Sequence, residues 1–248
     1  MAHKPQEHRT AVITGAESGI GRAVAKMLAA EGAGVFSLDR QQGEAQPGVT
    51  YVPCDVSSEE SVRAAVAVVA RAVSTVDILV NNAGVGALGT IEENTLSQWQ
   101  DVFDVNVFGT VRVTALFLPL LRAGGNSVIV NTCSTTASVG LTNRVLYSTS
   151  KGAIRAMTLA MAADMATEGI RVNCVEPGSV DTPWVKRRLE ESADPTAVLA
   201  ELSAFQPMGR LITAEEVALA ICYLASPGAS STTGVSLPVD GGLSSIRL

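Results

Sequence analysis

Short apolar runs alternate with longer amphipathic segments along almost the whole chain. The apolar runs predict strands at residues 11–14, 34–39, 51–56, 77–80, 127–131, 171–175 and 236–239. The amphipathic segments predict helices at residues 58–73, 95–117, 147–168 and 214–225, and an earlier one that ends at Glu31. Strands that alternate with helices are typical of a doubly wound sheet. We therefore predict an α/β fold with one parallel sheet of about seven strands and helices on both faces.

The alternation breaks in two places. Residues 1–9 are polar and precede the first apolar run, so they predict a flexible N-terminal tail. Residues 181–204 are polar and charged, a composition that suits a mobile helical lid over a site. No linker, repeat or low-complexity segment divides the rest, and residues 10–248 are expected to form a single domain.

The composition narrows the class of protein. Hydrophobic residues make up 47% of the chain and charged residues 17%, which suits tightly packed helices over a covered sheet and further burial in an oligomer. The net charge of −6 argues against nucleic-acid binding, which needs a basic surface. No apolar run reaches the ~18–20 residues of a membrane span, and the N-terminus lacks the apolar core of a signal peptide. We expect a cytoplasmic protein that acts on a small molecule and binds neither nucleic acid nor a membrane.

The spacing of cysteines and histidines predicts no metal site. Four cysteines are scattered without a C-x-x-C pair: Cys54, Cys133, Cys174 and Cys222. Reduced thiols are the expectation for such a chain. Both histidines, His3 and His8, fall in the predicted tail, so a histidine-based catalytic or metal site is not expected.

A glycine-rich turn joins the first strand to the first helix, with the sequence G-x-x-x-G-x-G over residues 15–21. Glycines let the backbone turn sharply and approach a pyrophosphate, and the helix N-terminus offers free N–H groups. Because the motif lies between a strand and a helix, it favours a dinucleotide site, with a plain glycine turn as the alternative. The candidate cofactor contacts are Gly15, Glu17, Ser18, Gly19, Ile20 and Gly21.

Asp39, the last residue of the second predicted strand, indicates which cofactor binds. An acid there can accept hydrogen bonds from both hydroxyls of the adenosine ribose, and it would repel a 2′-phosphate. Glu17 adds a second negative charge near the same place, whereas Arg40 could hold a phosphate. Two acids outweigh one arginine, and the sequence predicts NAD rather than NADP.

Tyr147 and Lys151 open the predicted helix at residues 147–168. Residues four apart lie on one face of a helix, one turn from each other. A fixed positive charge near a phenol lowers its pKa from ~10, so the tyrosine can exchange protons nearer neutral pH. The pair is either an acid–base device or an ordinary exposed helical pair, and spacing alone does not separate the two.

Other polar residues follow the strands or interrupt the helices. The fourth strand runs into Asn-Asn-Ala-Gly at residues 81–84, a place where ligands bind in open α/β sheets, although a structural turn is an equal alternative. Asn106 lies on an otherwise apolar helical face and is either a satisfied core residue or a functional one. Ser134 follows the fifth strand.

Together these residues closely resemble the motifs of the short-chain dehydrogenase/reductase family, over about residues 10–242. The resemblance rests on residues 14–21, Asp55 with Val56, residues 81–84, Asn106, Ser134, Tyr147 with Lys151, Pro177 with Gly178, and residues 240–242. Each motif is weak alone, but all of them in order and at family spacing are specific. The resemblance implies a Rossmann-like fold.

The resemblance also implies roles for individual residues. Tyr147 would be the general acid–base, and Lys151 would lower its pKa and bind the nicotinamide ribose. Ser134 would hold the substrate oxygen, and Asn106 would anchor a water in the proton relay. Further cofactor contacts are implied for Asp55, Val56, Asn82, Ala83, Gly84, Pro177, Gly178, Val180 and Thr182.

The implied activity is NAD-dependent interconversion of a secondary alcohol and a ketone or lactone. Hydride leaves for the nicotinamide while Tyr147 takes the hydroxyl proton, and no metal is needed. One alternative is a reductase of 3-oxoacyl groups or of bulky, steroid-like ketones, whose usual NADPH is disfavoured by Asp39 and Glu17. Another is a dinucleotide-sensing protein without chemistry, for which loss of the tyrosine or lysine would be the mark. The resemblance and the apolar composition also suggest a homotetramer.

The loop before Tyr147 is similar to that of members acting on sugars, sugar acids and short 3-hydroxy acids. In the acid-specific members an arginine at the place of Arg144 clamps a carboxylate. The chain departs from them at Phe205, where a second arginine is expected, and this leaves a neutral sugar or sugar lactone about equally favoured. Arg144 is otherwise a solvated loop residue. Trp184 would either stack on a sugar ring or make an apolar lid contact.

Overall fold

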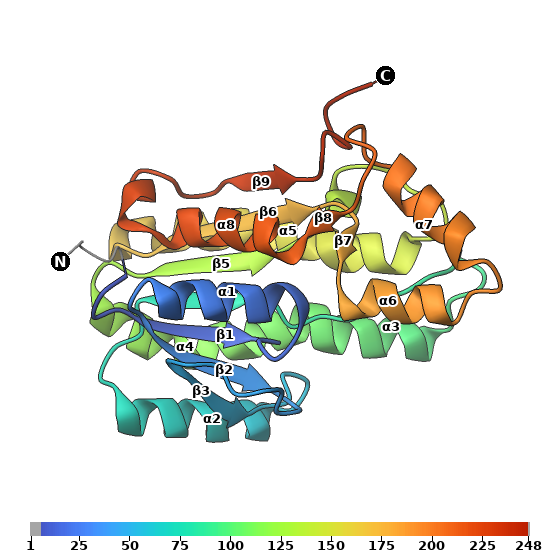
Figure 1. Ribbon diagram of the computed structural model, residues 1–248. Coiled ribbons are helices and arrows are strands. Elements are labelled where there is room, and N and C mark those ends of the chain that lie inside the picture. The colour runs from blue at the N-terminus through green and yellow to red at the C-terminus, as the bar shows by residue number, and fades with distance from the viewer. Residues whose placement is uncertain (1–5, 248) are drawn as a thin grey trace.

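The computed structural model describes residues 6–247 and has one central sheet of parallel strands (Figure 1). The sheet contains seven strands in the order β3-β2-β1-β4-β5-β6-β9. Their bounds are β1 Thr10–Thr14, β2 Gly34–Asp39, β3 Val49–Pro53, β4 Ile78–Asn81, β5 Val128–Thr132, β6 Arg171–Pro177 and β9 Ser236–Val239. The chain begins in the middle of the sheet and adds strands first on one side and then on the other, which confirms the predicted doubly wound α/β fold.

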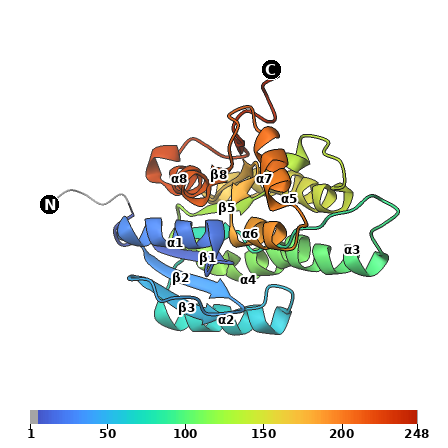
Figure 2. The same cartoon turned by 45° about the vertical axis from the view of Figure 1, so that its right-hand side comes forward.

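Helices cover both faces of the sheet. On one face lie α1 Gly19–Ala30 and α8 Ala214–Ala225, and on the other lie α2 Glu59–Ala72, α4 Gly109–Gly124 and α5 Val145–Met165 (Figures 1 and 2). Neighbouring residues of β1 show the alternation, since Val12 belongs to one buried cluster and Ile13 to the other. Strands buried on both faces must be apolar throughout, which is why they appear in the sequence as continuous runs.

A long helical region crosses one face of the sheet. It combines α3 Leu96–Phe103, the π-helical turn η1 Asp104–Phe108 and α4, and it ends later than predicted, where Gly125 adopts a left-handed φ of 73°. Over Leu96–Gly124 this region has a mean hydropathy of 1.4 in its most apolar window, and by length and composition it could cross a membrane. Core helices of soluble proteins also meet these measures, and the expectation that the protein binds no membrane stays a prediction. Val113 and Phe117 are fully buried against the sheet.

The chain between β6 and α8 forms the predicted helical cover (Figure 2). The helices α6 Pro183–Glu190 and α7 Pro195–Ala204 lie between two short strands, β7 Val180–Asp181 and β8 Ile212–Thr213, which pair with each other. Each helix begins with a proline, whose fixed φ suits the first helical turn. The two-residue strands were not predicted, because such short strands carry no periodic pattern. The mobility of this cover stays a prediction.

Among the smaller differences from the sequence prediction, two concern the end of β3 and the N-terminus. The strand β3 ends at Pro53, earlier than predicted, so Asp55 and Val56 lie in the loop at the carboxyl edge of the sheet. The predicted tail is described from residue 6, and there Gln6 and Arg9 are packed whereas Glu7 and His8 are exposed. Gln6 is fully buried, and Arg9 donates to its side-chain oxygen at 2.7 Å. Residues 1–5, which include His3, lie outside the described residues.

Candidate active site

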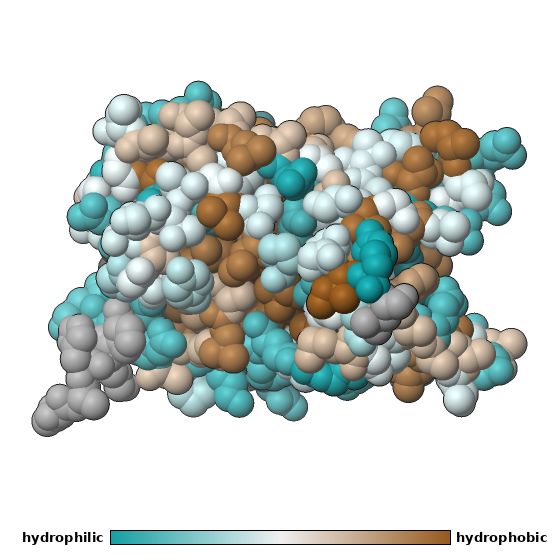
Figure 3. Space-filling model, turned by 90° about the horizontal axis from the view of Figure 1, so that it is seen from above, coloured by the Kyte–Doolittle hydropathy of each residue, from teal (hydrophilic) through white to brown (hydrophobic). Residues whose placement is uncertain are grey.

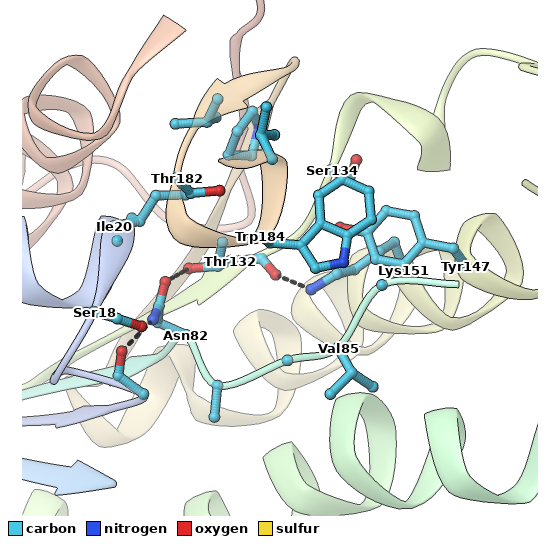
Figure 4. Close-up of a pocket in the computed structure, with 18 of the residues that line it drawn as sticks. Ser18, Ile20, Asn82, Val85, Thr132, Ser134, Tyr147, Lys151, Thr182 and Trp184 are labelled. Carbon is cyan, nitrogen blue, oxygen red and sulfur yellow. Dashed lines mark hydrogen bonds between the residues drawn. The ribbon is translucent and has the colours of Figure 1, made fainter. Parts of the chain in front are cut away.

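A cavity of 770 Å³ lies between the carboxyl ends of the central strands and the cover (Figure 4). The strand order reverses between β1 and β4, and open α/β sheets bind their ligands at such a point. Most of the predicted site residues line this cavity: Gly15, Ser18, Gly19, Ile20, Asp39, Arg40, Asp55, Val56, Asn82, Ala83, Gly84, Ser134, Arg144, Tyr147, Lys151, Pro177, Gly178, Val180, Thr182 and Trp184. Three predicted residues do not line it: Glu17, Gly21 and Asn106.

The turn between β1 and α1 has a shape that its glycines permit. Gly15 and Gly19 have φ values of 65° and 52°, in the left-handed region. A Cβ atom at Gly21 would overlap the carbonyl oxygen of Gly15, so this glycine packs inside the turn. The Asn82 amide donates to the carbonyl oxygens of Thr14 and Gly15, each at 3.1 Å, and ties the turn to the end of β4. The start of α1 is thereby held at the cavity, where a helix N-terminus can bind phosphate.

Asp39 ends β2 and lines the cavity beside Arg40. Its carboxylate accepts backbone N–H bonds from Glu17 at 3.2 Å and Gln41 at 3.3 Å. A carboxylate has about four acceptor positions, so two further donors, such as the vicinal hydroxyls of a ribose, can still bind.

Glu17 lies in the turn next to Asp39, as predicted, but it does not line the cavity. Its carboxylate accepts a hydrogen bond from the Ser37 hydroxyl and another, at 2.7 Å, from the N–H of Gly43. Ser37 is fully buried, and a buried hydroxyl needs a partner. The Glu17 carboxylate is therefore occupied within the protein, whereas the Asp39 carboxylate lines the cavity.

Asp55 and Val56 line the other end of the cavity. Ser57 donates to Asp55 Oδ1 from its hydroxyl at 2.6 Å and from its N–H at 2.9 Å. The hydroxyl bond is the main cause that holds the pKa of Asp55 below its usual value. The carboxylate is thus charged at neutral pH and fixed within its own loop.

Lys151 and Tyr147 lie side by side at the cavity (Figure 4). The Lys151 Nζ atom is 5.8 Å from the centre of the Tyr147 ring and donates to the Thr132 carbonyl oxygen at 2.8 Å. Lys151 is only 5% exposed. Within residues 6–247 it forms no ion pair with an acid. Lys151 therefore places an amine beside the Tyr147 ring with a carbonyl oxygen, rather than a carboxylate, as its partner.

Asn106 lies in the π-helical turn, an arrangement that often occurs at functional sites. Its amide oxygen accepts from the Val85 N–H at 2.8 Å, and its amide nitrogen donates to the Val85 carbonyl at 3.0 Å and the Ser150 hydroxyl at 3.1 Å. A Cβ atom at Gly84 would lie 3.2 Å from Asn106 Oδ1 and 3.5 Å from Lys151 Nζ. The asparagine therefore fixes the loop after β4 against α5, and its implied role as a water anchor stays a prediction.

Ser134 follows β5 and faces the same cavity. Its hydroxyl oxygen accepts from the N–H of Thr136 at 3.3 Å and from the Thr136 hydroxyl at 3.2 Å. Because both bonds are accepted, the proton of Ser134 is free to be donated to a bound oxygen. Figure 4 shows Ser134, Tyr147 and Lys151 grouped on one side of the cavity, with Ser18 and Asn82 on the other.

Arg144 and Trp184 contact each other in the wall of the cavity. The Arg144 guanidinium carbon is 5.8 Å from the centre of the indole, within the range of a cation–π contact, and Nη1 is 3.5 Å from the Ala87 carbonyl oxygen. Burial, followed by the charge of Arg188, lowers the pKa of Arg144 from its ordinary value. Arg144 is therefore partly buried at the cavity rather than a solvated loop residue.

Some residues of the cavity wall were missed from the sequence. The cover contributes Arg187 and Leu202, and the C-terminal segment contributes Leu243. Phe205, noted in the sequence as the place of an expected arginine, also lines the cavity. The run Lys-Arg-Arg at residues 186–188 was a usable signal, because it places positive charge on a helix that covers the site. The apolar residues carried no signal, since their chain positions do not reveal which face of the cover they occupy.

Two cysteines that are distant in the sequence lie together beside the site. Cys133, Cys174 and Glu176 are buried, and one ligand atom from each lies within 4.8 Å of the others. A hydrogen bond to Cys174, reinforced by burial, raises the pKa of the Cys133 thiol. Sequence spacing did not indicate this cluster, because adjacent strands rather than adjacent residues bring it together.

Comparison with known proteins agrees with this geometry. The family profile described as "Enoyl-(Acyl carrier protein) reductase" matches residues 15–244. L-fucose dehydrogenase of Bos taurus is 36% identical over 241 residues, covering 94% of this chain and 88% of that protein. Cis-4-hydroxycyclohexanecarboxylate dehydrogenase of Sinomonas cyclohexanicum is 37% identical over 248 residues, covering 96% of this chain and 97% of that protein.

A solved structure and a further relative extend the agreement. The ligand-free aldohexose dehydrogenase of Thermoplasma acidophilum superimposes with a TM-score of 0.92 at 34% identity, covering 100% of this chain and 99% of that one. Dehydrogenase/reductase SDR family member 6 of Xenopus laevis is 36% identical over 239 residues, covering 94% of this chain and 96% of that protein. The chain thus belongs to the short-chain dehydrogenase/reductase family.

Proposed function

We propose that the chain interconverts a secondary alcohol and a ketone or lactone, with NAD as the hydride carrier. One observation carries the proposal above all. Tyr147 stands beside the buried ammonium of Lys151, in the cavity that also contains Ser134 and the glycine turn. A phenol, a fixed cation and a free hydroxyl donor are the groups that proton transfer from an alcohol requires.

The residues of the chain divide this work among them. Ser134 donates its free proton to the substrate oxygen and orients the alcohol. Tyr147 takes the hydroxyl proton as the alcohol is oxidised, and Lys151 stabilises the phenolate. Asn106 keeps the loop at Gly84 in contact with Lys151. NAD, when bound, supplies the hydride acceptor.

The cavity suits a dinucleotide in shape and charge. The glycine turn leaves no side chain over the start of α1, so a pyrophosphate can approach the backbone closely. Asp39 lies at the end of β2 with acceptor positions to spare, which supports NAD. Arg40 lines the same region and is the residue that would favour a 2′-phosphate.

The substrate we propose is a sugar, a sugar acid or a short hydroxy acid. Arg144 and Arg187 both line the cavity, and across the described chain neither is paired with an acid. Arg144 supports a carboxylate near Tyr147, and Arg187 adds a second positive charge to the cavity wall. The relatives named for a sugar and for a hydroxycyclohexanecarboxylate support the same range.

An absorbance assay for NADH tests the function directly. The panel contains aldoses, polyols, aldonates, short hydroxy acids and, in the reverse direction, 3-oxoacyl thioesters and steroid-like ketones. We expect NAD-linked oxidation of at least one sugar, sugar acid or hydroxy acid. Turnover confined to NADPH and the ketones would instead establish the reductase alternative.

We also propose a cytoplasmic homotetramer. Exposed apolar side chains on the long helices support the assembly, with Phe108 at 50%, Val111 at 45% and Leu159 at 50% exposure. On another face, α8 exposes Leu219 and Tyr223. Figure 3 shows apolar side chains among polar ones on the face that carries β9. Symmetric association would remove such surfaces from water.

A further inference from the structure

A second cavity of 460 Å³ adjoins the first. It lies between the loop after β4, the helix α3 and the cover helix α6, with Val102 and Leu146 among its lining residues. Gly86, Ala87, Trp184 and Arg187 line both cavities. The two spaces are therefore neighbours that share one wall.

Trp184 is the largest part of that wall. A Cβ atom at Gly86 would lie 2.8 Å from two ring carbons of the indole and 2.9 Å from its nitrogen, so the ring packs directly on the glycine backbone. Arg144 contacts the indole from the first cavity. A flat ring held in this way separates the reacting centre from the space beyond without closing off either one.

Two residues of the second cavity contain buried polar atoms that have no hydrogen-bond partner in the described part of the chain. One is the acceptor Asn94 Oδ1, and the other is the donor Arg188 Nη1. Both atoms are enclosed by protein, so they do not face the open space of the cavity. Arg188 and Gln98 do line that space, and between them they offer N–H donors and a carbonyl acceptor to a hydroxyl group.

The charges around the second cavity balance. Two arginines and two acids line it, namely Arg187, Arg188, Asp101 and Glu191, together with the amide of Gln98. Equal numbers of positive and negative groups give no net preference for an anion or a cation. Polar groups of both kinds around an indole instead favour a neutral group that carries several hydroxyls.

From this juxtaposition we propose that the second cavity is a subsite for the remote end of the substrate, and that this end is a neutral polyhydroxylated group such as a second sugar ring. Trp184 divides the two subsites. The reacting ring lies beside Tyr147, and the remote ring lies between α3 and α6. This inference rests on the proposed function, because the first subsite is taken to be where the alcohol reacts.

Kinetics on matched substrates test the subsite. Glucose is compared with maltose, cellobiose and gentiobiose, and gluconate with maltobionate and lactobionate. In the unaltered enzyme at least one two-ring compound should have a kcat/KM about tenfold or more above its one-ring partner. Arg188→Met should remove about tenfold of this advantage through KM and leave the kcat/KM of glucose, the neutral one-ring substrate, unchanged, as loss of a charged hydrogen bond predicts. Arg188→Lys should restore part of it.

Lys186→Met is the matched control, because Lys186 is an exposed cation on α6 that lines neither cavity. It should leave both classes of substrate unaffected. Equal losses for one-ring and two-ring substrates in Arg188→Met, or no advantage for any two-ring compound, would overturn the subsite.

Binding separates failure of the subsite from failure of the proposed function. The chain has two tryptophans, so a Trp99→Phe enzyme reports on Trp184 alone. Even without turnover, maltose or cellobiose should change its fluorescence saturably, and Arg188→Met in this background should weaken that binding about tenfold. Absence of turnover with this binding intact would refute only the sugar oxidation. Absence of saturable binding by every two-ring compound would show that water alone fills the second cavity.

Discussion

The ammonium of Lys151 lies beside Tyr147 and forms no ion pair with an acid of the described chain. Its ammonium is buried and held by the Thr132 carbonyl oxygen, a dipole rather than a counter-ion. In the region the structure describes, no acid lies within ion-pair distance of it. A lysine already paired with a carboxylate would lower the energy of a phenolate much less.

Asp39 carries the cofactor preference in this account, since Glu17 is bound to Ser37 and Gly43. We expect NAD to bind at least tenfold more tightly than NADP, a difference of only ~1.4 kcal/mol and within one like-charge clash. Asp39→Asn should narrow the ratio, whereas Glu17→Gln should leave it within about twofold. Calorimetric titration with both cofactors measures these ratios, and equal affinities in the unaltered enzyme would contradict the assignment.

Arg144 decides between a carboxylate and a neutral substrate. If the substrate carries a carboxylate, Arg144→Ala should raise its KM about tenfold or more, because an ion-paired hydrogen bond contributes ~1.5–3 kcal/mol. A neutral alcohol should be affected much less. Steady-state kinetics on one acid and one neutral substrate give the comparison, and an equal effect on both would remove the carboxylate contact.

Residue roles could be predicted from the sequence where the contact is local. Tyr147 and Lys151 are one helical turn apart, so their meeting follows from helix geometry alone. The hydrogen-bond partner of the Glu17 carboxylate could not be predicted, because it is the buried Ser37 hydroxyl of β2, twenty residues away in the sequence. Asn106 was left between a core role and a functional one, and its contacts to Val85 and Ser150 show a positioning role.

Among the elements, α8 has a charged cap that should make stability depend on pH. Thr213 and Glu216 form a capping box, and Arg210 donates to Glu216 at 2.7 Å. The Arg210 bond is the main cause that lowers the pKa of Glu216 from 4.5 to about 2. The folded pKa is the lower one, so this stabilisation is complete above the unfolded pKa and is lost as the pH falls toward about 2.

Glu216→Gln isolates the charge, because glutamine can still complete the capping box. At neutral pH we expect a loss of ~0.2–1 kcal/mol, as for other exposed ion pairs. Below pH ~4.5 the variant and the unaltered protein should converge in stability. Urea unfolding at several pH values measures this, and a difference that stays constant down to low pH would rule out the ionised pair as its source.

Helices and strands were predicted correctly where buried positions recur at a regular spacing along the chain. Strands buried on both faces are apolar runs, and the amphipathic helices have a clear apolar face. It failed at β7 and β8, which are held by pairing with each other rather than by a pattern of their own. The π-helical turn at Asn106 was also not predicted, because the residues of a π-helical turn are of the same types as those of an α-helix.

At the scale of the whole molecule, the exposed apolar residues on the long helices predict association. We expect light scattering at micromolar concentration to give the mass of four chains. Val111→Glu should lower the assembly order, because a buried charge without a partner is costly in an interface. Lys26→Glu, on the outer helix α1, is a control that should not change the mass. A monomer mass for the unaltered protein would refute the tetramer.

The alternation of strands and helices predicted the topology of the sheet. It also predicted that the cavity would lie at the carboxyl edge of the strands. The packing of Gln6 and Arg9 and the second cavity could not be predicted from the sequence. Both depend on side chains from distant segments, such as Arg9 with Ala225, or Gly86 with Trp184. Such contacts require the folded backbone before they can be identified.

Replacing the Tyr147 hydroxyl tests the proposed chemistry with the least disturbance. Phenylalanine keeps the ring, so Tyr147→Phe should lower kcat by ~10²–10⁴-fold while NAD binds with nearly unchanged affinity. Lys151→Ala should weaken both turnover and NAD binding, because it removes the charge beside the phenol and a group at the cofactor cavity. A Tyr147→Phe enzyme that turns over at close to the unaltered rate would remove Tyr147 from the mechanism, and the dinucleotide-sensing alternative would then explain the fold better.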